Sequence, residues 1–176
     1  MSNIISLYHG TDIEAAKDIC KNGIKLDIGS AKVDFGPGFY LTDNYDQAVK
    51  WAKRKARYRQ SKAAVVTVMI DQSIADNIIE KFDDDLRWGR FIINIRNGYN
   101  SISHVAYKDH NLDQRYDITY GRIADLNVVD IADSLNESRK MLMDVDKILN
   151  TEYHYQYAIH TIQGLTAVVK RTYRTI

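Results

Sequence analysis

Cysteine and proline are almost missing from this sequence of 176 residues, which has one of each. The single cysteine, Cys20, excludes an internal disulfide and a cysteine-based metal site; we interpret it as a small core residue of a cytoplasmic protein. No internal repeat, linker or low-complexity segment interrupts the chain. We therefore expect a single domain over residues 1–176, long enough to bury a hydrophobic core.

Long apolar runs and an excess of one charge are missing as well. No stretch approaches the roughly 18 apolar residues that a membrane span needs, and the first residues lack the basic and apolar parts of a secretion signal. We therefore expect no membrane association. The net charge of +1 gives no general attraction to polyanions. Because the histidines and acidic residues lack the spacing of zinc or calcium ligands, we expect no bound metal.

Short apolar segments alternate irregularly with helical patterns, which predicts an α+β fold rather than a doubly wound parallel sheet. A capping box formed by Thr11 and Glu14 starts the first predicted helix, and Gly23 ends it. Asn44 with Gln47 starts the second. The predicted strands are 4–9, 39–42, 64–70, 116–120 and 155–160; the further predicted helices are 73–82, 86–96, 135–149 and a short one near 164–169, followed by a basic tail.

Tyr8-His9-Gly10-Thr11 stands at the end of the first predicted strand. A histidine at a strand end is usually structural. Here the imidazole could bond a ribose hydroxyl while the backbone of Gly10 approaches a carboxamide without a side-chain clash.

Residues 34–42, Asp-Phe-Gly-Pro-Gly-Phe-Tyr-Leu-Thr, form the second informative segment. Tyr40 can be a half-buried strand aromatic, but Gly36 and Gly38 leave bare backbone beside it, where a nicotinamide ring could stack. The Asp-Phe-Gly triplet is not the kinase motif, because the glycine-rich nucleotide loop and the catalytic-loop aspartate are missing.

Two further features have ordinary and functional interpretations. Gln156, at the start of the last predicted strand, is a surface residue unless it faces the same cleft as His9 and Tyr40. The run from Lys50 to Lys62 holds seven basic residues and no acidic one. It is either a solvated helix face or a surface that attracts a pyrophosphate or a nucleic acid.

Taken in order, these segments resemble the ADP-ribosyltransferase superfamily, in the branch of diphtheria toxin and the poly(ADP-ribose) polymerases. The sequence is similar to a group of small bacterial domains of unassigned function in that superfamily. Those domains also carry a Tyr-Asp-Ile-x-x-Gly-x-Ile-Ala-Asp segment, matched at 116–125, and a Gln-aromatic-x-x-His-Thr strand, matched at 156–161. The resemblance covers nearly the whole chain and implies a split, mixed or antiparallel β-sheet core with flanking helices.

The resemblance also implies a site for NAD as co-substrate. His9 would bond the adenosine ribose, the backbone of Gly10 would hold the nicotinamide amide, and Tyr40 would stack on the nicotinamide ring. Gln156 would stand in the place of the catalytic glutamate. Asp125 and Asp34 are the candidate surrogate acids, and Thr11, Asp34 and Gly38 complete the implied donor site.

The glutamine at position 156 is a departure from the superfamily pattern. It can bond the ribose 2′-hydroxyl but carries no charge and cannot act as a base. The expected activity is mono-ADP-ribosylation of a macromolecule, protein or nucleic acid, by a toxin, a defence effector or a counter-defence effector. A toxin would also have a neutralising antitoxin-type protein partner. The alternatives are an NAD glycohydrolase and an inactive module that binds NAD or nucleic acid.

Overall fold

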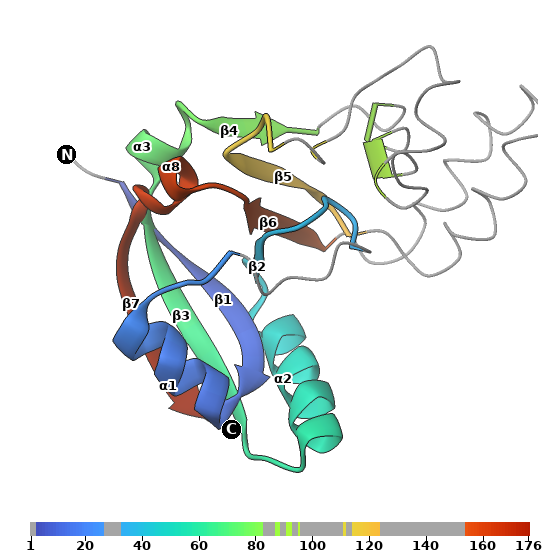
Figure 1. Cartoon of the computed structure of the whole chain (residues 1–176), viewed down its shortest axis with the longest axis vertical. Helices are drawn as coiled ribbons and strands as arrows, with labels where there is room; N and C mark the ends of the chain where they lie inside the picture. Colours follow the sequence, from blue (N-terminus) through green and yellow to red (C-terminus); the bar gives the residue numbers. More distant parts are fainter. Residues whose placement is uncertain are drawn as a thin grey trace, which may run out of the picture.

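The fold is a seven-stranded mixed sheet, seen in a computed structural model that describes residues 3–26, 33–82, 87–88, 91–92, 95, 111, 114–123 and 154–176. Within these residues the strand order is β4-β5-β6-β2-β1-β3-β7, and each neighbouring pair is antiparallel except β4 with β5. Figure 1 shows the long β1, β3 and β7 on one side and β4, β5 and β6 on the other. The strands are β1 Ile4–Asp12, β2 Phe39–Thr42, β3 Ala63–Asp71, β4 Ile79–Lys81, β5 Ile118–Arg122, β6 Tyr155–Ile159 and β7 Val168–Thr175.

Two helices of ten and fifteen residues, α1 Ile13–Asn22 and α2 Tyr45–Arg59, lie against opposite faces of the long strands (Figure 1). One core cluster joins Ala16 of α1 to the β3 residues Ala64, Val66 and Val68. Another joins the alanines of α2 to Val65. Because neighbouring residues of a strand point to opposite faces, this division of β3 separates an α1 face from an α2 face of the sheet.

A third cluster covers the α2 face of β2, β5 and β6. It is aromatic, with Phe35, Phe82, Trp88 and Phe91 packed around Ala158. Phe35 comes from the loop before β2, so the core itself holds the Asp34–Gly36 segment against the sheet. This packing places that loop beside the start of β6.

Helix starts agree only in part with the sequence prediction. Asn44 caps α2 by accepting from the Gln47 amide, as predicted. Asp12, rather than Thr11, caps α1, because its carboxylate accepts from the amides of Glu14 and Ala15 while Thr11 still belongs to β1. The side chain of Glu14 is paired with Lys17 on the surface. The capping-box prediction was therefore wrong by one residue.

Other elements differ from prediction where packing overrides the local pattern. Instead of one helix over 73–82, the chain forms α3 Gln72–Ala75 and then turns into β4. The short helix α8 Ile162–Leu165 precedes the predicted one, and the predicted basic tail is strand β7, which pairs with β3 along its length. The fifth strand begins two residues later than predicted. Residues 87–88, 91–92 and 95 are helical; the predicted helix 135–149 lies outside the described residues.

Candidate functional site

Gln156, Asp34 and Tyr40 come together on the α2 face where β2 pairs with β6. In the ladder Tyr40 lies opposite Ala158 and Thr42 opposite Gln156, so the side chains of Tyr40, Thr42 and Gln156 share one face. The Nε2 atom of Gln156 donates to Oδ2 of Asp34 at 2.9 Å. Both side chains are more than nine-tenths buried. The structure thus joins the proposed glutamate substitute to a carboxylate 122 residues away.

Tyr40 is held rigidly by the loop that carries Asp34. Its hydroxyl accepts from the Phe35 amide at 2.9 Å and donates to the Gly36 carbonyl at 2.7 Å. Its ring lies nearly parallel to that of Phe35, with centroids 6.4 Å apart. A ring with its hydroxyl fixed at both hydrogen-bonding functions is a preorganised aromatic wall.

His9 lies at the junction of β1 and β2, with its ring on the other face. The ring stacks on Phe39 at 4.4 Å, within the α1-face cluster. Its Nδ1 lies 2.7 Å from the Tyr40 carbonyl oxygen and must donate, since that oxygen only accepts. Burial, followed by the charge of Lys55, lowers the pKa of His9 to about 3. At neutral pH the ring is therefore uncharged, and Nε2 is left as an acceptor for a hydroxyl.

The glycines of the two motifs are required by packing. A Cβ on Gly10 would lie 2.0 Å from the Ala48 carbonyl oxygen, so helix α2 reaches β1 only because position 10 has no side chain. A Cβ on Gly38 would lie 2.8 Å from Nδ1 of His160 and from the Ile159 oxygen. Thr11 is buried at the end of β1. Asp125 lies outside the described residues.

His160 has a structural role that the sequence motifs did not predict. Its Nδ1 donates to the Pro37 carbonyl at 2.6 Å, and its Nε2 accepts from the Thr119 hydroxyl at 2.8 Å. It thus ties the glycine-rich loop to β5 and β6. Burial lowers the pKa of His160 to about 4. The histidine of the Gln-aromatic-x-x-His-Thr segment was the signal that could have indicated this role.

A groove of about 340 Å³ opens beside the site, between α2 and the residue that precedes β6. Its lining includes Trp51 and His154, and the backbone carbonyl of His154 accepts from the Ile123 amide, which extends the β5–β6 ladder. Asn44 donates from Nδ2 to Nδ1 of His154 at 3.3 Å. Because His154 continues the ladder one residue before β6, its side chain should lie on the same face as that of Gln156, about 7 Å along the chain. The groove is completed by Gln47, Lys50 and Arg54.

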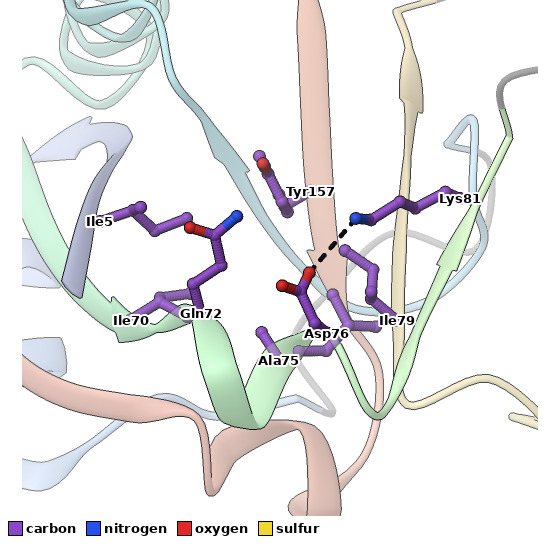
Figure 2. A pocket seen from close by; sticks show the side chains of 9 residues that line it. Ile5, Ile70, Gln72, Ala75, Asp76, Ile79, Lys81 and Tyr157 are labelled. Atoms are coloured by element: carbon purple, nitrogen blue, oxygen red, sulfur yellow. Dashed lines mark hydrogen bonds and ion pairs between the residues drawn. The ribbon is translucent and has the colours of Figure 1, made fainter. Parts of the chain in front are cut away.

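A second pocket lies on the α1 face, away from these residues. Figure 2 shows Gln72, Tyr157 and the Asp76–Lys81 ion pair around it, among isoleucines. Its volume of about 30 Å³ holds little more than a water molecule. A nucleotide has no room there.

Within the part of the chain that the structure describes, no three metal-ligating side chains gather into a site. The same part contains no helix that is both long and apolar enough to cross a membrane.

A family model described as "Protein of unknown function (DUF3990)" matches residues 5–169. The match therefore includes every site residue described above. No curated protein sequence matches the chain.

Proposed function

This chain belongs to the DUF3990 family, whose description carries no activity, and from that premise we propose that it is an NAD-dependent mono-ADP-ribosyltransferase. The proposal includes the fold relationship: a sheet with the split architecture of the ADP-ribosyltransferases. The sequence motifs support it, because the matched histidine, tyrosine and glutamine stand on β1, β2 and β6, at the centre of the sheet. The observation that carries it is the hydrogen bond between Gln156 and Asp34 beside Tyr40.

The paired Gln156 and Asp34 can together do what one glutamate does elsewhere in the superfamily. Breaking the bond between nicotinamide and ribose leaves an oxocarbenium-like centre, which a nearby carboxylate stabilises. The Gln156 amide has no charge, but the Asp34 carboxylate that accepts from its Nε2 has one. With Nε2 engaged by Asp34, Oε1 is the Gln156 atom that can accept a hydrogen bond from the ribose 2′-hydroxyl.

NAD in this proposal lies across the junction of β1 and β2. Its nicotinamide riboside contacts Tyr40, Gln156 and Asp34 on the α2 face. Its adenosine ribose donates a hydroxyl proton to Nε2 of His9, whose tautomer is set by the Tyr40 carbonyl. Because the two rings point to opposite faces of the sheet, NAD must bend to contact both of them.

Release of nicotinamide from NAD by the purified protein tests the proposal. We expect Asp34→Asn and Gln156→Ala each to lower the rate about 100-fold, the usual effect of removing one transition-state contact. Gln156→Glu should keep or raise it. Asp12→Asn is the matched control, since Asp12 is a similarly buried aspartate that caps α1, and it should release nicotinamide at the wild-type rate.

An assay with labelled NAD distinguishes transfer of ADP-ribose from hydrolysis of NAD and from binding without reaction. Label on a macromolecule means transfer, whereas free ADP-ribose alone means hydrolysis and makes the protein an NAD glycohydrolase. If folded protein binds NAD but releases no nicotinamide, and Gln156→Glu is equally silent, the enzyme proposal is wrong and the protein is a binding module. The proposed cytoplasmic toxin, defence or counter-defence role, with an antitoxin-type partner in the first case, depends on transfer.

A further inference from the structure

The exposed face of α2 is a strip of basic and aromatic side chains. Ala48, Ala52 and Ala56 are buried against the sheet. The opposite side of the helix presents an outer stripe, which we define as Lys50, Trp51, Arg54, Arg57 and Tyr58; all five are exposed. The stripe is about 12 Å long at the usual rise per helical residue.

Charge on this stripe is concentrated far beyond the average of the molecule. The whole chain has a net charge of +1, but residues 47–62 hold seven basic residues and no acidic one. Among the described residues, Arg59 alone of these seven forms an ion pair, with Asp12. The three basic residues of the stripe therefore have no described carboxylate partner, and they are available for a polyanion.

Two large aromatic side chains stand within this basic field. Tyr58 is 90% exposed and Trp51 is 45% exposed. The Arg54 guanidinium lies over the Trp51 ring, 5.3 Å from its centroid. Flat rings set among phosphate-binding side chains are how proteins bind unpaired nucleotides, because every base has a face that can stack. A double helix offers phosphates to such a stripe but keeps its bases stacked inside.

The groove beside the stripe has dimensions and groups suited to one base. Its volume of about 340 Å³ falls in the range of small-molecule sites. Trp51 lines it, and so does Gln47, whose Oε1 is buried without a hydrogen-bond partner in the described part of the chain. A base amino group that donates to this oxygen removes the cost of leaving it unsatisfied.

We propose that the outer stripe of α2 binds single-stranded nucleic acid and presents a nucleotide in the groove as the acceptor of ADP-ribose. The acceptor part rests on the proposed function; the binding part does not. His154 lines the groove and stands two residues before Gln156 in the chain, so a base in the groove lies next to the proposed donor site. The bond between nicotinamide and ribose breaks, and nicotinamide leaves with the electron pair. A nitrogen or oxygen of the nucleotide bonds to the anomeric carbon, and its proton passes to water.

Fluorescence anisotropy with a labelled 20-nucleotide strand, as RNA and as DNA of the same sequence, tests binding without NAD. A plot of log affinity against log salt concentration falls with a negative slope. Lys50→Ala/Arg54→Ala/Arg57→Ala should make this slope less steep by about 2, the value for three lost phosphate contacts. Trp51→Ala should weaken binding about tenfold through lost stacking. The matched control Lys21→Ala/Lys170→Ala/Arg174→Ala removes three exposed charges from α1 and β7 and should bind as wild type.

Several outcomes overturn the binding part. They are no binding by wild type at low salt, equal binding of the matching duplex, or equal losses in the triple variant and its control. Circular dichroism of each variant shows whether it is folded. Because the stripe is exposed, a folded triple variant is expected.

Transfer from radiolabelled NAD to the same strand tests the acceptor part. The wild type should label the strand. In the triple variant this labelling should fall at least tenfold, whereas the rate of nicotinamide release from NAD alone should equal that of the wild type. Nicotinamide release with a bound but unlabelled strand overturns the acceptor, as does label found on protein instead. Absence of any nicotinamide release refutes the proposed function, and the anisotropy result then still decides the binding part.

Discussion

At the scale of single residues, glycine has the most demanding roles in this protein. In the sequence, Gly10 predicts a place where a ligand can approach the backbone without a side chain in the way. The structure shows that α2 already occupies the space where its side chain would be, with the Ala48 oxygen 2.0 Å from a Cβ at position 10. Gly23 is different: its φ is +97°, and a Cβ at this position would meet no atom within 4 Å. Gly10 is required for close approach, and Gly23 for its backbone conformation.

Gly10→Ala should lower the free energy of unfolding by on the order of 3 kcal/mol, because the backbone of α2 must shift to admit the methyl group. Gly23→Ala should cost less, about 1–2 kcal/mol, because φ +97° with ψ 175° is a backbone conformation that only glycine adopts readily. Urea unfolding of both variants measures the difference. A larger loss for Gly23→Ala than for Gly10→Ala contradicts this account of the packing.

At the scale of elements, strand β1 runs further than local signals indicate. Thr11 has the hydroxyl and the spacing to Glu14 of a helix start, yet β1 continues through Asp12 because β3 pairs with it along all nine residues. The cap then passes to Asp12, whose carboxylate also accepts from Arg59 at 2.9 Å. Tertiary pairing, rather than the local pattern, decides where α1 begins.

Asp12→Ala should therefore destabilise the protein by about 2 kcal/mol, since it removes the cap of α1 and leaves two amides without their acceptor. Glu14→Ala should change stability by less than about 0.5 kcal/mol, because its only described partner is Lys17 in an exposed pair. Thermal unfolding of the two variants checks this. Losses of stability of similar size in the two variants would mean that Glu14 also caps α1, as the capping-box prediction states.

At the scale of the whole molecule, two neutral histidines hold the centre of the sheet together. His9 bonds β1 to the backbone of β2, and His160 bonds the loop before β2 to β5 and β6. Burial depresses the pKa of both, to about 3 and about 4. In the unfolded chain each would titrate near its ordinary value of 6.5.

The free energy of unfolding should have its full value above pH 6.5 and should fall as the pH drops toward 4. In that interval the two histidines take up protons in the unfolded chain but not in the folded protein. His160 alone accounts for a loss of about 1.4 kcal/mol for each pH unit in the interval. Denaturant unfolding at pH 7, 6 and 5 measures this slope in wild type and in His160→Gln. A slope that the substitution leaves unchanged would mean that other groups cause it.

The sequence by itself determined the α+β class, the strands at 39–42 and in the β3 region, and the cap of α2. It also singled out Asp34 and Tyr40, which the fold places near Gln156. These depend on short-range signals such as β-branched runs, a capping asparagine and a glycine-rich turn. It did not determine β7, whose basic and mostly exposed residues become a strand because they pair with the edge of β3.

The tertiary structure alone decided that Asp34 bonds Gln156, that the His9 ring lies on the opposite face from Tyr40, and that a groove separates α2 from His154. The physical reason is the same in each case. Residues more than 30 positions apart meet through the register of β1, β2 and β6, and register follows from the packing of both faces at once. No local pattern contains that information.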